Sequence, residues 1–152
     1  MVRGLTEIKI RGENVARGLK EGLDYFPLDV EMEDKIELIE AKFGMVGFAI
    51  IIKLYQKIYK NGYYCNFGED ELLLFAKKIN VDINTINAVI NEAIARNVFN
   101  NVIYNQFNVL TSHGIQKRYF EATLRRKKVT IKKEYLLYDD INFKNVNINK
   151  DN

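Results

Sequence analysis

Cys65 and His113 each occur once in the sequence, and a thiol beside an imidazole is the pairing that activates a nucleophilic cysteine. One cysteine and one histidine cannot supply the four nitrogen and sulfur ligands of a structural zinc site. We expect Cys65 to lie in a buried aromatic strand and His113 in the first turn of a helix. We therefore interpret Cys65 as a small core residue and predict no catalytic role for the pair.

Carboxylates are the second candidates for chemistry. The spacing of Glu33, Glu37 and Glu40 places them on one face of a helix, where they could bind a divalent cation. A solvated helix face opposite Ile36 and Ile39 explains the same spacing. The sequence contains neither a phosphate-binding P-loop nor a glycine-rich dinucleotide motif after a strand. We expect no enzyme activity, no cofactor and no metal ion.

Asparagines form a stripe on a predicted helix. Asn84, Asn87 and Asn91 fall at i, i+3 and i+7, away from the isoleucine face of the segment 83–96. Asparagine can pair with the N6 and N7 edge of adenine in the major groove, so the stripe suits base reading. Only Arg96 is basic there, although phosphate neutralisation supplies most of the affinity for DNA.

Basic side chains are concentrated later in the chain. Aromatic Tyr119, Phe120 and Tyr135 stand among them, and this mixture suits single-stranded nucleic acid. Alternatively, both aromatics on the helix belong to the core and the basic end only complements the helix dipole. If one helix spans 112–128, Arg118 and Arg125 share a face. The candidate nucleic-acid contacts in this segment are Lys117, Arg118, Arg125, Arg126, Lys127 and Lys128.

Charge is segregated along the chain. Residues 23–40 contain seven acids and one lysine, whereas residues 112–135 contain eight bases and two acids. This polarity can steer an anionic partner or promote head-to-tail self-association. The plainer interpretation is a solvated surface.

The composition is that of a globular protein. The chain has 152 residues, the usual size of one domain, with 47% hydrophobic and 28% charged residues. A single cysteine precludes an internal disulfide, so we expect a reducing, cytoplasmic location. The longest apolar run, residues 45–52, is far shorter than the roughly 20 residues of a membrane span, and we expect no membrane association.

The hydrophobic periodicity predicts the elements that position these residues. The segment 23–30 should be an extended lead-in that places Tyr25 and Phe26 on the core. Helices are expected over 34–43, 45–60, 69–79 and 83–96, with Asp82 as N-cap of the last. A strand is expected at 63–67, further strands at 98–99, 102–104 and 108–111, and a helix over 112–128 whose inward side chains are Ile115, Tyr119, Ala122 and Leu124.

Two helices across the tight link at 80–81 have the spacing of a helix-turn-helix, and a β-hairpin after them would be a wing. The predicted fold is therefore mainly α with a small β wing, a winged helix-turn-helix. We expect a flexible N-terminal extension at 1–22, the winged-helix domain at 23–138, with residues 135–138 docked on it, and a flexible tail or linker at 139–152.

Several short motifs in order carry a family resemblance. They are residues 22–29 (GLDYFPLD), 34–41 (DKIELIEA), 43–44 (FG), 58–64 (IYKNGYY), 109–112 (VLTS) and 114–119 (GIQKRY). In this order they resemble the N-terminal winged-helix domain of phage and prophage replication proteins, related to DnaD-like replisome organisers. The resemblance implies a role in loading the replicative helicase and a tendency to self-assemble, and it carries over no functional residues.

Two functions follow as hypotheses. The first is a non-enzymatic, DNA-associated module of a phage-type replication initiation protein that contacts single- or double-stranded DNA through the basic helix 112–128. The alternative is a protein–protein assembly domain that forms a homo-oligomer or docks a replicative helicase or its loader. The weakly basic helix 83–96 motivates this alternative.

Overall fold

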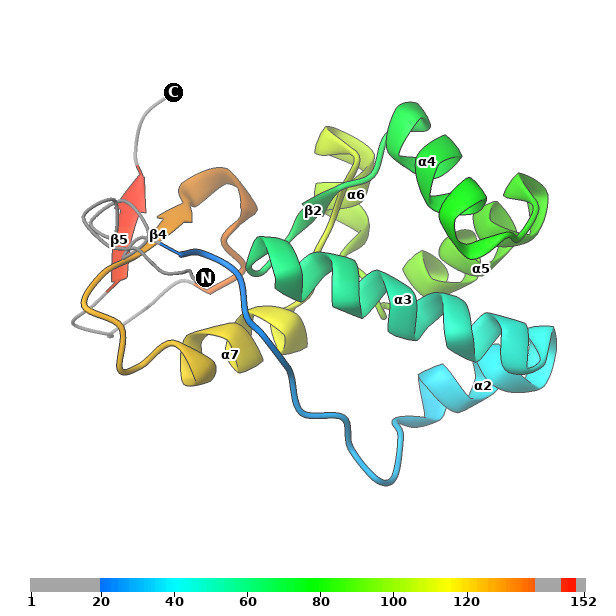
Figure 1. The fold of residues 1–152 in the computed structure, drawn as a ribbon, viewed down its shortest axis with the longest axis horizontal. Helices are drawn as coiled ribbons and strands as arrows, with labels where there is room; N and C mark the ends of the chain where they lie inside the picture. The colour runs from blue at the N-terminus through cyan, green and yellow to red at the C-terminus, as the bar shows by residue number, and fades with distance from the viewer. Residues whose placement is uncertain (1–19, 139–145, 150–152) are drawn as a thin grey trace, which may run out of the picture.

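The computed structural model describes residues 20–138 and 146–149. Within them the fold is mainly helical with small two-stranded sheets (Figure 1). The helices are α2 (Asp34–Phe43), α3 (Met45–Asn61), α4 (Glu69–Ile79), α5 (Ile83–Ala95), α6 (Asn101–Phe107) and α7 (His113–Ala122), with a 3₁₀ turn η1 (Lys133–Tyr135). The strands are β2 (Cys65–Asn66), β3 (Val109–Leu110), β4 (Val129–Lys132) and β5 (Val146–Asn149).

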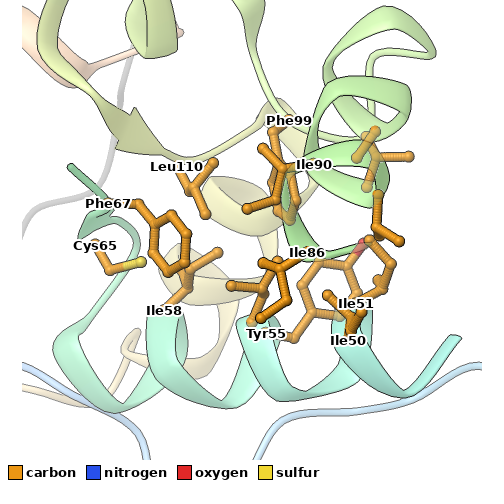
Figure 2. Packing of buried hydrophobic residues seen from close by; sticks show 14 of the residues in the cluster. Ile50, Ile51, Tyr55, Ile58, Cys65, Phe67, Ile86, Ile90, Phe99 and Leu110 are labelled. Carbon is orange, nitrogen blue, oxygen red and sulfur yellow. The ribbon is translucent and has the colours of Figure 1, made fainter. Parts of the chain in front are cut away.

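Helix α3 runs through the middle of the molecule, and α2, α5 and β2 pack against it (Figure 1). Figure 2 shows its inward side chains, among them Ile51, Tyr55 and Ile58, pointing toward α5 and toward Phe99 and Leu110. These side chains are almost fully removed from water, which is the main source of stability for a core of this kind. The helical stripe predicted over 45–60 is confirmed.

The junction between α2 and α3 is a single residue. Gly44 has a φ of +76°, which side-chain-bearing residues rarely adopt, and its N–H caps the Glu40 carbonyl at 2.7 Å. Gly47 lets the two helices approach, because a Cβ there would lie 2.7 Å from Phe43 Cβ. Gly44 therefore ends the first helix as the sequence predicts.

Helices α4 and α5 meet across the predicted tight link. Asn80 ends α4 in the left-handed conformation with a φ of 57°. Asp82 then caps α5 by accepting hydrogen bonds from the backbone N–H of Thr85 at 2.9 Å and from its hydroxyl at 2.7 Å. Both helices and the Asp82 cap are confirmed.

The hairpin predicted at 98–111 does not form, because residues 101–107 form α6, whereas the strand predicted at 108–111 is present as β3. The Asn100 side chain accepts a 2.9 Å hydrogen bond from the Ile103 N–H, and Ile103 is buried while Val102 is exposed. That cap and the helical burial pattern override the β-propensity of the segment. Strand β3 instead pairs antiparallel with β2, with Cys65 opposite Leu110.

The helix predicted over 112–128 is shorter than expected, because α7 ends at Ala122. The Thr123 hydroxyl donates to the Tyr119 carbonyl at 2.8 Å, and the Arg126 N–H bonds the Thr123 carbonyl at 2.9 Å to form a turn. Ala122 and Leu124, predicted to face inward, are exposed. Residues 125–128 therefore connect α7 to β4 as a loop, and Arg118 and Arg125 do not share a helix face.

A second cluster of buried residues lies beside α7 and β4, built by Tyr63, Tyr119, Phe120, Val129 and Ile131. Tyr135, Leu136 and Tyr138 pack against it, as predicted. Strand β4 pairs in parallel with β5, with Val129 opposite Val146. Residues 146–149 were expected in the tail, and the alternation of apolar residues and asparagines there suits a strand. The rest of the predicted tail, 139–145 and 150–152, lies outside the described residues.

The lead-in begins earlier than the sequence indicated. Phe26 stacks on Tyr59 with ring centroids 4.8 Å apart, whereas Tyr25, predicted on the core, is 86% exposed. Gly22, assigned to the extension, is buried and lies so close to the carbonyl oxygen of Lys60 that a Cβ at this position would clash with it. The remainder of the expected extension, 1–19, lies outside the described residues. No helix in the described ranges is long and apolar enough to cross a membrane.

Candidate nucleic-acid interface

The predicted basic residues lie on several elements. Helix α7 carries Lys117 and Arg118, and the loop after it carries Arg125, Arg126, Lys127 and Lys128. Two further lysines follow, Lys132 at the end of β4 and Lys133 in η1. All of them belong to the part of the molecule built by α7 and β4 (Figure 1).

Arg118 is directed inward. Its guanidinium is half-buried and donates from Nη1 to the Tyr59 hydroxyl across 3.5 Å, a long bond. It also lines a small pocket with Phe26, Asp29 and Tyr55, between the lead-in and α3. Arg118 therefore packs between α7, α3 and the lead-in, and its assignment as a nucleic-acid contact stays a prediction.

Arg126 holds the lead-in. Its guanidinium donates to three successive carbonyl oxygens, those of Lys20 at 2.8 Å, Glu21 at 3.1 Å and Gly22 at 2.7 Å. The Tyr119 hydroxyl donates to the Glu21 carbonyl at 2.8 Å beside them. Because these donors are engaged by the chain itself, Arg126 is less available to a ligand than its neighbours, and its assignment as a nucleic-acid contact stays a prediction.

Six basic side chains remain accessible. All are exposed, and none of them takes part in an ion pair among the described residues. Two acids, Glu121 and Glu134, are interspersed with them. A cation-rich surface of this kind attracts polyanions. We call it the basic surface, and its members are Lys117, Arg125, Lys127, Lys128, Lys132 and Lys133.

The aromatic side chains near the basic surface differ from those predicted. Tyr119 and Phe120 are 2% and 3% exposed, so they are core residues and cannot stack on bases. Tyr135 is half-buried and lies against Tyr64 and Phe107, with ring centroids 4.7 and 5.3 Å apart. Of the three aromatics proposed for stacking, only Tyr135 is accessible.

Lys132 covers the two tyrosine rings. Its Nζ lies 5.6 Å from the centroid of Tyr64 and 5.5 Å from that of Tyr135, which is cation–π distance. The neighbouring Tyr64 side chain raises the pKa of the Lys132 ammonium, so Lys132 carries its charge at neutral pH. Tyr64, Phe107, Lys132 and Tyr135 form what we call the Tyr135 cluster. The alternation of residues in β4 and at 63–67 is the sequence signal that could have identified Lys132 and Tyr64.

The asparagine stripe lies apart from the basic surface. Asn84 and Asn91 are exposed and Asn87 is half-buried, on the side of α5 opposite Ile86 and Ile90. Helix α5 lies by α2 and α4, away from α7 (Figure 1). The asparagine stripe and the basic surface therefore do not form one common site.

The charge near the stripe is also compensated. Arg96 donates from Nε to Glu92 at 2.6 Å, and Glu92 also binds Lys42 at 2.8 Å. These two cations hold the pKa of the Glu92 carboxyl below its usual value. Arg96, the basic residue at the C-cap of α5, is thus already paired within the protein.

Cys65 and His113 have different surroundings. Cys65 lies in the main core, and burial raises the pKa of its thiol to about 12, so the thiol stays protonated at neutral pH. His113 is exposed, and its ring lies 5.3 Å from that of Tyr138. A protonated core thiol is a poor nucleophile.

The three glutamates proposed to bind a cation lie at the N-cap of α2 and along that helix. Glu33 and Glu37 are exposed and Glu40 is half-buried, opposite the buried Ile36 and Ile39. Across residues 20–138 and 146–149, no three acids, histidines or cysteines lie close enough together to hold a metal ion.

Comparison with known proteins shows which family and which relative the chain resembles. Residues 25–115 match the family described as Lin1244/Lin1753-like, N-terminal. The chain is 53% identical over 127 residues to an uncharacterized phage-related protein, Lin1244/Lin1753, of Listeria innocua serovar 6a. That alignment covers 82% of this chain and 42% of the relative, so the chain spans less than half of that protein's length. No solved structure matches the chain. The match over most of its described residues shows that the chain belongs to the Lin1244/Lin1753-like N-terminal family.

Proposed function

We propose that this chain is the DNA-binding N-terminal module of a phage-type replication protein and that it contacts DNA phosphates through the basic surface. The observation that carries the proposal is the set of six exposed cations on α7, the following loop, β4 and η1, none of them in an ion pair among the described residues. Phosphate neutralisation by such cations releases counterions and supplies most non-specific affinity for DNA.

The Tyr135 cluster favours a single-stranded substrate. Tyr64 and Tyr135 are each partly exposed, next to Lys132. Stacking on an aromatic ring contributes about 1–3 kcal/mol per base and is open only to unpaired bases. If bases stack on the Tyr135 cluster, the chain should bind single-stranded DNA more tightly than duplex.

The order of elements supports a winged-helix interpretation. The chain passes from α3 through the strand β2 to α4 and α5, which meet across a tight turn. After α6 it returns in the strand β3, which pairs with β2. Helix α6 occupies the place where a further strand of a wing would lie. The relation to DnaD-like replisome organisers, and any contact with a helicase or loader, rest on the resemblance of the sequence and on the phage-related relative.

Fluorescence anisotropy with short single- and double-stranded DNA, at several salt concentrations, tests the proposal. The affinity should fall linearly on a log–log salt plot, with a slope of roughly 0.9 per phosphate for duplex and 0.7 for single strands. The double variant K127E/K128E should bind at least about tenfold more weakly and reduce the slope by about two contacts.

The matched control is K77E, compared with the single variant K128E, because it makes the same change of charge on an exposed lysine of α4 outside the basic surface. It should bind DNA nearly as wild type does. If K127E/K128E binds DNA as tightly as wild type, or if K77E loses as much affinity as K128E, the basic surface is not the contact.

The asparagine stripe gives a second, weaker candidate contact with duplex. The double variant N84A/N91A changes two exposed side chains of α5 and should leave single-strand affinity unchanged. A selective loss of affinity for one duplex sequence would assign base reading to α5.

Assembly is the alternative function, and it depends on a different surface. A groove between α3 and α4 has an apolar floor and is bordered by lysines. That surface belongs to neither the basic surface nor the asparagine stripe.

A further inference from the structure

The groove between α3 and α4 is a hollow of about 730 Å³. Its floor is apolar and includes Val46, Ile50, Leu74, Phe75 and Val81. Val46 is 47% exposed and Leu74 is 71% exposed, although both are large hydrophobic side chains. Apolar side chains gathered in a concave surface are typical of a binding site for another protein segment.

The border of the groove carries charge of one sign. Lys53, Lys57, Lys60 and Lys78 line it, and no acidic residue does. None of these lysines forms an ion pair within the part of the chain that the structure describes. An occupant that combines apolar side chains with carboxylates would satisfy both the floor and the border.

The lead-in of the chain has that composition. Tyr25 is 86% exposed, Leu28 is 48% exposed and Val30 is 106% exposed, in an extended stretch with no helix or strand of its own. Exposed Asp24, Asp29 and Glu31 alternate with them. We call residues 24–31 the acidic segment. Phe26 packs on Tyr59, but Tyr25 and Val30 are almost wholly uncovered within their own molecule, and the charge of the segment is opposite to that of the groove.

The acidic segment and the groove adjoin on the surface. A shallow hollow lined by Asp24, Tyr25 and Phe26 shares Gln56 and Lys60 with the groove. Two copies related by a two-fold axis near this junction can therefore each place one surface over the complementary surface of the other. Such a reciprocal contact closes into a dimer, whereas a one-way contact would continue into a chain of molecules.

We propose that the α3–α4 groove binds the acidic segment of a second copy of this chain, and that two such contacts form a symmetric dimer. The dimer would bury the exposed apolar side chains of the segment on the apolar floor and set its carboxylates against the four lysines. This surface is distinct from the basic surface, so dimerisation leaves Lys127 and Lys128 open to DNA.

Nucleic acid is the competing occupant of a lysine-lined groove. The floor argues against it, because phosphates gain nothing from Val46, Leu74 and Phe75 and would leave them exposed. A groove without carboxylates can accept either an acidic protein segment or nucleic acid. The acidic segment of a second copy is favoured because it combines apolar side chains with a charge opposite to that of the groove.

A charge-swap experiment on the full chain tests the proposal by sedimentation velocity over concentrations up to several hundred micromolar. The groove variant is K53E/K78E and the segment variant is D29K/E31K, all at exposed positions. Each variant alone places like charges in contact and should associate at least tenfold more weakly than wild type. A mixture of the two makes both contacts attractive again and should restore the dimer.

Two further variants test whether a weaker dimer reflects loss of the proposed contact or a general effect of misfolding or net charge. Y25S/V30S removes apolar side chains that have no cover in the monomer, so it should keep the wild-type unfolding transition and still weaken the dimer. K127E/K128E changes the same net charge elsewhere and should dimerise as wild type does.

Several outcomes would overturn the proposal. They are a wild-type chain that stays monomeric throughout the concentration range, single variants that dimerise normally, and a mixture that fails to recover the dimer although both variants are folded. Loss of DNA affinity in K53E/K78E with unchanged self-association would make the groove a nucleic-acid site instead. DNA binding that is retained while dimerisation is lost leaves the proposed function intact, so the two failures are distinguishable.

Discussion

Arg126 Nη2 donates a 2.7 Å hydrogen bond to the carbonyl oxygen of Gly22, 104 residues earlier in the chain. The same guanidinium also reaches the carbonyls of Lys20 and Glu21. Gly22 is buried against the Lys60 carbonyl, and the Leu23 N–H donates to the Tyr59 carbonyl at 2.7 Å. A residue whose sequence context suggests DNA binding therefore fastens the lead-in to the loop after α7, and the Leu23 N–H fastens it to the end of α3.

Arg126→Ala should destabilise the protein by about 1–3 kcal/mol, because three carbonyl oxygens lose a charged donor. Arg126→Lys should restore little of this, since an ammonium cannot reproduce the planar fork. Arg125→Ala is the matched control, and its exposed side chain should change the stability by less than about 0.5 kcal/mol. Urea unfolding measures both. Equal stability of the two alanine variants would contradict the anchoring role.

Gln116 should be indispensable to the docking of residues 135–138. Its buried amide donates to Thr111 Oγ1 at 3.1 Å and to the Tyr135 carbonyl at 2.7 Å, and its oxygen accepts from the Leu137 N–H at 3.0 Å. Gln116→Leu keeps the size but leaves these groups unpaired, at a cost of roughly 2–4 kcal/mol.

The Gln116→Leu variant should also lose protection from hydrogen exchange at Leu137, because the acceptor of that N–H is removed. Gln106→Leu, an exposed position on α6, is the control and should leave both measurements unchanged. Unaltered protection at Leu137 in Gln116→Leu would show that the segment docks by other contacts.

Asp82 should make stability depend on pH in the acid range. The hydroxyl and N–H of Thr85 hold the pKa of Asp82 below its ordinary value of 3.8. A carboxyl whose pKa is lowered by folding stabilises the native state above the unfolded-state pKa, and this contribution is lost as the pH falls through the folded-state pKa. Stability linked to Asp82 is thus present at neutral pH and disappears in acid.

Melting temperatures of Asp82→Asn and wild type between neutral and acid pH measure this effect. Asparagine keeps an acceptor for the Thr85 N–H but carries no charge, so Asp82→Asn should melt at a lower temperature than wild type at neutral pH. This difference in melting temperature should close as the pH falls through the folded-state pKa of the Asp82 carboxyl. Asp82→Ala loses the acceptor as well, so its melting temperature at neutral pH should be lower than that of Asp82→Asn. A deficit of Asp82→Asn that stays constant with pH would contradict the linkage.

Cys65 should be unreactive in the folded protein. With a pKa near 12 instead of 9.0, the thiol forms far fewer thiolates at mildly alkaline pH, and the core also blocks access to it. Ellman's reagent should therefore modify the native chain very slowly and the urea-unfolded chain at once. Because Cys65 is the one cysteine of the sequence, the signal reports a single site. Stoichiometric modification on mixing with the native protein would disprove its burial.

Local chemistry in the sequence determined α2 to α5. The stripe of α3, the stop at Gly44 and the cap at Asp82 depend on residues within one or two turns of each other, so periodicity and capping rules suffice to predict them. The basic character of residues 117–133, and the separation of acidic from basic segments, are also properties of the sequence alone.

Only the tertiary structure decided how those charges are used. Arg118 and Arg126 turn toward the lead-in because carbonyl and hydroxyl acceptors from nearly 60 to more than 100 residues away converge on them, and no local rule anticipates such acceptors. Helix α6 replaces the predicted hairpin because β3 finds its partner in β2, a strand before α4. Pairing and burial between distant segments outweigh the small local propensities that the sequence displays, and they also decide which cations and apolar side chains remain exposed for partners.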